Sequence, residues 1–262
     1  MPNDIKLDLR DGIATVTFNR PDQRNAINYE GWLELGRIAT ELASDADARV
    51  VVFKGSGEDA FSAGADIKDF HKYRSDSSKA KEYSFAFDGA LAAIEDLPQP
   101  TVCAIKGFCI GGGCELSMAA DIRVTADNGV FGIPVAHLGI LIGYREMWRL
   151  IDLVGRGNAS YILLSGRRFP ADEAFHMGLV NQVLPLSEVD GHVEKLAQDM
   201  VPLAPLSQRR NKEIMRTVLG DPALNGLTSE QEHLPFANFD SEDFLEGRLA
   251  FLEHRKPEFK GQ

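Results

Sequence analysis

Two segments rich in small residues carry the residue types that could stabilise a developing negative charge. The first, Ser62-Ala63-Gly64-Ala65-Asp66, follows an apolar segment and a polar loop. The second, Gly111-Gly112-Gly113, also follows an apolar segment, and Glu115 comes two residues after it. Where a strand ends in small residues and a helix begins, backbone N–H groups lack partners and the helix dipole adds positive charge. Two such turns can direct two N–H groups at one oxygen, which makes an oxyanion hole.

Strands and helices alternate around these two segments. Alternating apolar residues on both sides of Asp11-Gly12 predict a β-hairpin. The segments RVVVFKG and TVCAIKG are too apolar to be half-exposed, so they predict buried parallel strands. Apolar residues at helical spacing predict helices from about residue 28 and over residues 78–97, and a third helix follows the glycines. The chain from about Glu146 onward is mostly helical, so the pattern as a whole is α/β with a helical C-terminal part.

The composition excludes several classes of protein. The chain has 262 residues, 44% of them hydrophobic and 26% charged, which fits one large domain or a domain with a small helical appendage. A formal net charge of −11 disfavours nucleic acid or an anionic membrane as a partner. We expect no membrane span, because no apolar segment is long enough. Polar residues at the start and three clustered cysteines predict reduced core thiols in a cytoplasmic protein, and no metal-ligand spacing occurs.

Six motifs, in order along nearly the whole chain, resemble the crotonase family, which is the enoyl-CoA hydratase/isomerase superfamily. They are FNRPDQRNAIN, FSAGADIKDF, IKGFCIGGGCELSMAADIRVT, FGIP with LGI, SGRRFPADEAFHMGLVNQVLP and SEDFLEGRLAFLEHRKPEFKG. The resemblance implies an α/β fold, a crotonase-like spiral of ββα turns with a helical C-terminal trimerisation region. Residues 1–200 would form the acyl-CoA-binding core and residues 201–262 the oligomerisation region of a homotrimer or hexamer.

The same resemblance implies an acyl-CoA thioester as substrate, with CoA as part of the substrate and no separate cofactor. The thioester oxygen would accept the backbone N–H groups of Ala65 and Gly112, and Glu115 would be the acid/base. Residues implied to contact CoA are Arg24, Ala26, Ala63, Asp66, Ile67 and Lys68 and, toward a neighbouring subunit, Phe251.

One departure from the family's pattern concerns the second glutamate that its hydratases use. That glutamate follows the proline of an FG-x-P-E segment, and in the segment FGIPVAHLG of this chain Val135 takes its place. Valine cannot transfer a proton, so Glu115 acts alone or another group substitutes. Glu146 is the expected substitute, with an ordinary first-turn helix carboxylate as the alternative.

Three further side chains near the departure have open roles. Tyr144 either hydrogen-bonds the substrate or is a packed aromatic residue. Arg145 either pairs with an acidic acyl tail or forms a structural ion pair. His137 is expected to be structural.

The predicted function is that of an acyl-CoA lyase or isomerase that stabilises a thioester enolate. The alternative is another crotonase-type reaction on a CoA thioester, namely decarboxylation, thioester hydrolysis or C–C bond hydrolysis. A non-catalytic binder is the third reading. Some family members bind RNA through a lysine-rich helix, but here the matching helix has only Lys79 and Lys81 against four acidic residues.

Overall fold

The strands of the computed structural model, which describes residues 4–262, form two sheets. The larger sheet has the order β1-β2-β3-β5-β7-β10 and the smaller one β4-β6-β8-β9. β1 and β2 form the predicted antiparallel hairpin, and the other neighbours in the larger sheet are parallel. The strands are β1 (Ile5–Arg10), β2 (Ile13–Phe18), β3 (Val50–Gly55), β4 (Ala60–Ser62), β5 (Thr101–Ile105), β6 (Phe108–Ile110), β7 (Ile122–Ala126), β8 (Val130–Gly132), β9 (Phe169–Pro170) and β10 (Gln182–Leu184).

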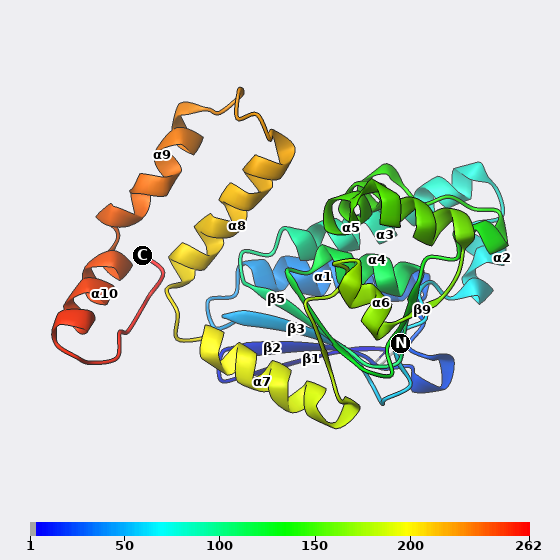
Figure 1. The fold of residues 1–262 in the computed structure, drawn as a ribbon, viewed down its shortest axis with the longest axis horizontal. Coiled ribbons are helices and arrows are strands. Elements are labelled where there is room, and N and C mark those ends of the chain that lie inside the picture. The colour runs from blue at the N-terminus through cyan, green and yellow to red at the C-terminus, as the bar shows by residue number, and fades with distance from the viewer. Residues whose placement is uncertain (1–3) are drawn as a thin grey trace.

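Helices cover both faces of the larger sheet (Figure 1). The helices are α1 (Tyr29–Ala43), α2 (Phe70–Tyr73), α3 (Ser77–Glu95), α4 (Gly112–Ala119), α5 (Tyr144–Ser165), α6 (Ala171–His176), α7 (Val189–Met200), α8 (Pro205–Gly220), α9 (Ser229–Ala237) and α10 (Glu242–Leu252). The 3-10 turns are η1 (Pro21–Gln23), η2 (Ile67–Asp69), η3 (Val135–Leu138), η4 (Leu186–Glu188) and η5 (Asn238–Asp240).

A strand–strand–helix unit repeats along the chain. In β3-β4-α3, β5-β6-α4 and β7-β8-α5, the first strand lies in the larger sheet, the second in the smaller sheet, and a helix follows. The predicted spiral of ββα turns is therefore confirmed. Because β4, β6 and β8 are parallel neighbours, the segments that follow them meet at one edge of the smaller sheet.

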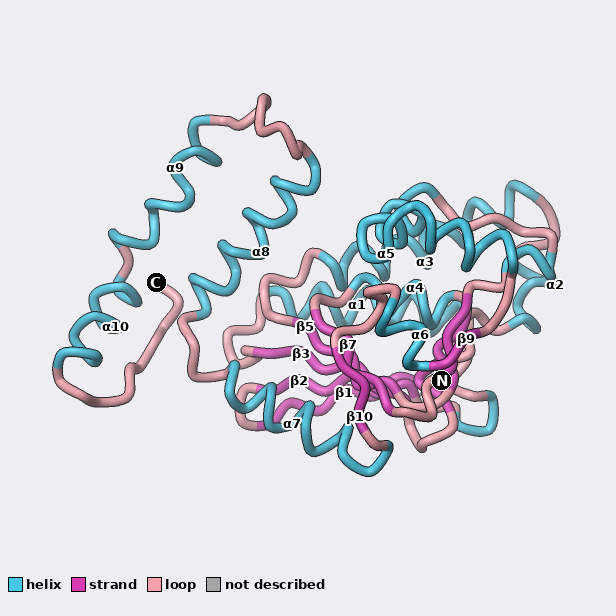
Figure 2. The backbone as a smooth tube through the Cα atoms, in the orientation of Figure 1, coloured by secondary structure: helices cyan, strands magenta, loops and turns pink. Residues whose placement is uncertain are grey.

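Burial on both faces explains why the parallel strands are apolar throughout. Along β3, Val51 and Phe53 pack in the larger core with α1 and α3, whereas Val50 and Val52 pack in a second core against α7. Figure 2 shows α7 on one side of the strands and α1, α3, α4 and α5 on the other. A strand covered on both faces has no solvent side on which polar residues could alternate.

The predicted helices form with small differences. Asn28 caps α1 by accepting a hydrogen bond from Gly31 N at 2.8 Å, as its residue type favours. The segment after the first small-residue turn begins as the 3-10 turn η2, in which the Asp66 side chain accepts a hydrogen bond from Lys68 N. Helix α5 consists of two helical segments separated at Gly155, whose φ of 71° and ψ of 162° are not helical. Cys103, Cys109 and Cys114 are free and buried, as predicted.

Helices α8, α9 and α10 extend away from the sheets as an arm (Figure 1). Lys212 of α8 anchors the arm, because its ammonium donates to Gln99 O at 2.9 Å and to Asp121 Oδ2 at 2.7 Å. Burial lowers the pKa of Lys212 while Asp121 opposes that shift. Within residues 4–262, no helix is both long and apolar enough to cross a membrane.

Candidate active site

The two small-residue turns predicted from the sequence lie against each other in the structure. They follow β4 and β6, which are parallel neighbours. Gly64 has φ +91°, and a Cβ on it would lie 2.6 Å from Ile110 O and 2.8 Å from Gly112 N. Only glycine combines that backbone conformation with so close an approach.

The backbone N–H groups of Ala65 and Gly112 have no hydrogen-bond acceptor within the described part of the chain. Their neighbours are paired: Asp66 N donates to Ile27 O at 2.9 Å, and Gly111 N donates to Gly132 O at 2.8 Å. A Cβ on Gly112 would lie 3.3 Å from Ala65 N, so the two N–H groups are close together. Unpaired donors in such a place favour an acceptor from a ligand.

These N–H groups border a cavity of about 1340 Å³. Its wall is mainly apolar, and its residues come from the turn after β4, from α3, from the start of α4 and from the segment between β8 and α5. The apolar residues are Ile67, Phe70, Phe87, Phe108, Ile110, Val135, Leu138, Ile140, Leu141 and Ile142. A cavity of this size and composition accommodates a large ligand with an apolar part.

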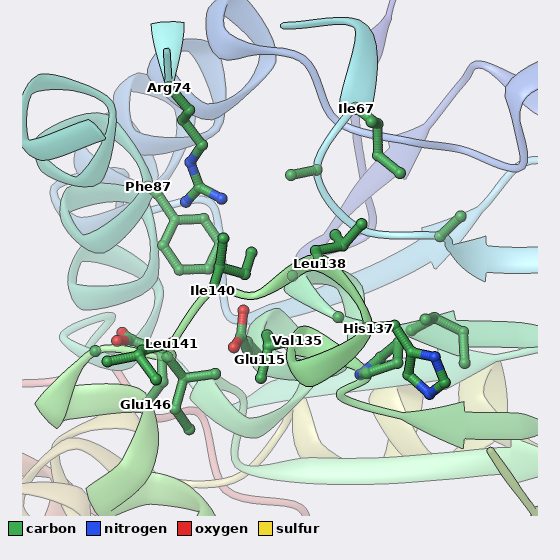
Figure 3. A pocket seen from close by; sticks show the side chains of 18 of the residues that line it. Ile67, Arg74, Phe87, Glu115, Val135, His137, Leu138, Ile140, Leu141 and Glu146 are labelled. Carbon is green, nitrogen blue, oxygen red and sulfur yellow. The ribbon is translucent and has the colours of Figure 1, made fainter. Parts of the chain in front are cut away.

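Glu115 projects into this cavity from the first turn of α4 (Figure 3). Glu115 is 6% exposed, and its carboxyl group makes no hydrogen bond or ion pair with any residue that the structure describes. Burial, together with the negative charge of Glu146, raises the pKa of Glu115 to about 8, although the positive charge of Arg74 acts in the opposite direction. A carboxyl group with a pKa near neutrality can both give and take a proton.

Val135 lies beside Glu115 in the cavity (Figure 3). It begins the 3-10 turn η3, whose other residues include His137. His137 lines the cavity, but its Nε2 lies 3.2 Å from Gly166 O, which fits the structural role expected for it.

Glu146 lines the same cavity, but its carboxylate has a partner. It is 1% exposed, and its Oε1 accepts from Arg149 at 3.1 Å. Arg149 also donates to Glu95 at 2.5 Å, so the three side chains form an ion cluster in which Glu146 and Arg149 are buried and Glu95 is partly exposed. The expected substitute acid therefore belongs to a structural ion pair and also acts electrostatically on Glu115.

Tyr144 and Arg145 border the cavity at the start of α5, and both are exposed. Tyr144 is 97% exposed, so it does not pack against residues of the described chain. Arg145 forms no ion pair among residues 4–262, so no structural ion pair is seen for it within this chain.

The residues predicted to contact CoA divide into two groups. Arg24, Ala63 and Ile67 line the cavity, and the Arg24 guanidinium lies 4.6 Å from the centre of the Phe108 ring. The other residues of this prediction, Ala26, Asp66, Lys68 and Phe251, do not line it as the structure describes it.

Each side chain outside the cavity has a physical reason for its position. Asp66 pairs with Arg20 at 2.9 Å and caps η2, so it is structural. Ala26 offers its carbonyl to Arg20, and Lys68 is exposed. Phe251 lies on α10, in the arm, where it is 81% exposed beside a separate hollow.

Sequence reasoning missed four charged residues of the cavity, which are Arg74, Asp88, Arg167 and Arg168. Asp88 belongs to the face of α3 formed by Ala80, Ser84 and Phe87, so the helical spacing from Ala80 was an available signal. Burial raises the pKa of Asp88, and Glu146 raises it further. Arg74 stands in the segment between α2 and α3, where no sequence pattern indicates the direction of a side chain.

Comparisons with known proteins agree with this architecture. The family model for enoyl-CoA hydratase/isomerase matches residues 8–262. The short-chain-enoyl-CoA hydratase of Clostridium acetobutylicum is 32% identical over 98% of this chain and 97% of its own length. The carnitinyl-CoA dehydratase of Escherichia coli K12 is 34% identical over 100% of both chains.

Solved structures give the same result. An enoyl-CoA hydratase/carnithine racemase from Magnetospirillum magneticum superposes with a TM-score of 0.95 at 35% identity, covering 100% of this chain and 97% of that one. An enoyl-CoA hydratase from Bacillus anthracis superposes with a TM-score of 0.93 at 31% identity, covering 99% and 100%. The fold, the matched residues and these relatives together show that the chain belongs to the enoyl-CoA hydratase/isomerase family.

Proposed function

We propose that this protein enolises an acyl-CoA thioester, with the thioester oxygen on the N–H groups of Ala65 and Gly112 and with Glu115 as the acid/base. The observation that carries the proposal is the pair of unpaired N–H groups next to a buried carboxyl that also lacks a partner. Negative charge on the enolate oxygen would lie between the two donors. One such donor typically lowers the activation barrier by about 2.7–4 kcal/mol.

The CoA part of the substrate would lie along the turn after β4 and over Arg24. Supporting this, Arg24 and Arg168 both lie over the Phe108 ring at one end of the cavity, with guanidinium-to-centroid distances of 4.6 and 6.0 Å. Two cations at one end suit the phosphates of CoA. No separate cofactor enters this proposal, because the proton transfers need only Glu115 and the two N–H groups.

The reaction that suits one proton-transfer group is movement of a proton between carbons of the enolised thioester. Adding water needs a group to deprotonate the water and a source of the α-proton, and Val135 removes one of the two groups. We therefore propose isomerisation or proton exchange as the favoured chemistry, with slow hydration of short 2-enoyl-CoA. The relatives are named as hydratases or dehydratases, so water addition and removal belong to the same proposal.

Hydrogen–deuterium exchange tests the enolate directly. In deuterium oxide, the protein should exchange the α-protons of butanoyl-CoA, and mass spectrometry should show the mass increase. Val135→Glu should raise the rate of crotonyl-CoA hydration by about 10²-fold or more, because it restores a positioned proton-transfer group. Val135→Gln is the matched control and should give no increase. Absence of α-exchange in the wild type would contradict the proposal.

Gly64→Ala tests the two N–H groups. A Cβ at Gly64 must displace Ile110 O or Gly112 N, so the donors move apart. We expect turnover to fall about 10²–10³-fold, as for the loss of one oxyanion donor, with little change in CoA affinity. Gly89→Ala is the control, because Gly89 is a helical glycine with nothing within 4 Å of a Cβ. Equal turnover in the two variants would refute the role of the turn.

The arm formed by α8, α9 and α10 is proposed to mediate a homotrimer or hexamer, with residues 1–200 as the acyl-CoA-binding core and residues 201–262 as the oligomerisation region. In support, the arm exposes large apolar side chains, a pattern typical of interfaces. They are Phe236, Phe239, Leu245, Leu249, Phe251 and Leu252. Light scattering measures the mass in solution and would contradict this assignment if the protein were monomeric.

A further inference from the structure

Arg74 is a cation of the cavity that has no acidic partner. Its guanidinium lies 4.2 Å from the centre of the Tyr83 ring and 4.8 Å from that of Phe70. Neither a carboxylate nor another hydrogen-bond acceptor pairs with its side chain in the part of the chain from residue 4 to 262. The two aromatic faces therefore hold the guanidinium in position and leave its N–H donors available.

Arg74 lies over the rings of Phe70 and Tyr83, whereas Arg24 and Arg168 lie over the ring of Phe108, so the lining holds its cations against two different sets of aromatic residues. Figure 3 shows Arg74 pointing toward Glu115 from the opposite side of the cavity, with Phe87 beside it. Arg74 is also the cation with the largest effect on the pKa of Glu115. If CoA lies at the end of the cavity with Arg24 and Arg168 and the thioester lies at Glu115, the acyl chain extends toward Arg74.

Two cations that line this end, Arg74 and Arg145, have no ion-pair partner among residues 4–262, and of the two only Arg74 is held against aromatic rings, those of Tyr83 and Phe70. Glu146 is paired with Arg149, and Glu115 has a pKa of about 8, so most of it is neutral at pH 7. Asp88 lines the same end without an ion pair to Arg74. A guanidinium with open donors in a largely apolar cavity suits a carboxylate, which it can bind through two parallel hydrogen bonds.

We propose that Arg74 binds a carboxylate at the far end of the acyl chain, so that the preferred substrates are short 2-enoyl-CoA thioesters that end in a carboxylate. This inference rests on the proposed function, because the thioester position defines which end of the cavity holds the acyl tail. It names Arg74 as the residue that determines specificity for the acyl group. Asp88, on the same wall, disfavours the carboxylate, so Asp88→Asn should strengthen the preference.

The test compares two acyl groups of matched shape. One is 4-carboxybut-2-enoyl-CoA, and the other is 5-methylhex-2-enoyl-CoA, in which two methyl groups replace the carboxylate oxygens. We expect the wild type to have the higher kcat/KM with the carboxylate. Because Arg74→Met also removes a charge that acts on Glu115, the test is the ratio of the two kcat/KM values, which should fall roughly 30-fold or more, mainly through a higher KM for the carboxylate substrate.

Two further variants make the result specific. Lys72→Met removes an exposed cation on α2 that lies outside the cavity, and it should leave the preference unchanged. Arg74→Lys keeps the charge without the two-donor geometry, so it should retain part of the preference. Thermal unfolding of Arg74→Met checks that this variant still folds. If it does not fold, the kcat/KM values of Arg74→Lys are compared with those of the wild type instead.

The outcomes separate this inference from the proposed function. Equal kcat/KM for the two substrates in the wild type, or an equal loss on both in Arg74→Met, overturns the inference while the enolisation stands. A preference for a tail ending in a trimethylammonium group also overturns it and assigns specificity to Asp88. If neither substrate reacts, the proposed function fails. The affinities of the saturated thioesters 4-carboxybutanoyl-CoA and 5-methylhexanoyl-CoA then decide the role of Arg74.

Discussion

The starts of α4 and α5 form a natural comparison, because each helix follows a strand pair and each has a glutamate in its first turn. Both glutamates are buried and both line the cavity. Glu115 on α4 has no partner among the described residues, whereas Glu146 on α5 accepts from Arg149 at 3.1 Å. The difference teaches that burial alone does not make a carboxyl group a proton carrier. A neighbouring cation converts the same residue type into a structural charge.

The largest expected difference between the two glutamates is in activity when each is replaced by glutamine. Glu115→Gln should lower α-proton exchange about 10²–10⁴-fold, because Glu115 is the proposed proton-transfer group and glutamine cannot transfer a proton. Glu146→Gln should change the rate much less, because its carboxylate is already paired. Exchange of deuterium into butanoyl-CoA measures both. A larger loss in Glu146→Gln would show that Glu146 carries the proton.

The two variants should also differ in the free energy of unfolding. In the folded protein Glu115 has a pKa of about 8, against an ordinary value of 4.5. Ionisation of this carboxyl therefore lowers the free energy of unfolding, by nothing below about pH 4.5 and by an increasing amount as the pH rises toward 8. At pH 7, Glu115→Gln should therefore stabilise the fold by on the order of 3 kcal/mol. Glu146→Gln should destabilise it, because Arg149 loses a buried partner.

Urea unfolding at pH 4 and pH 7 measures this difference for both variants. The stabilisation by Glu115→Gln should vanish at pH 4, where the wild-type carboxyl is protonated in both the folded and the unfolded state. An equal gain at both pH values would mean that relief of packing strain, and not the ionisation of Glu115, explains the effect.

The smallest expected effect is a shift in the pH dependence of exchange. The negative charge of Glu146 contributes to the raised pKa of Glu115, so Glu146→Gln should lower that pKa by less than about one unit. Exchange by Glu115 as a base rises with pH through its pKa, and the midpoint near pH 8 should therefore move to lower pH. A midpoint that moves upward would contradict the electrostatic coupling.

The fold and half of the site could be predicted from the sequence. Periodicity gave the hairpin, the buried parallel strands and the helices, because strand and helix periods are local properties of the chain. The glycines of the two turns were visible in the sequence, and at Gly64 the reason is steric, because a Cβ there would lie 2.6 Å from Ile110 O and 2.8 Å from Gly112 N. Glu115 followed from its place in the first turn after the glycines.

The sequence by itself determined the residue types, the alternation of strands and helices, and the place of Glu115 in the first turn after the glycines. Only the tertiary structure decided which charges are paired. The ion pair between Arg149 and Glu95 joins α5 to α3, and Arg74 rests on Tyr83 of α3 while it faces Glu115 of α4. Such contacts depend on how separate helices pack and on which rotamers remain, and no local pattern encodes either. The physical reason is that a charge acquires its role from its neighbours in space.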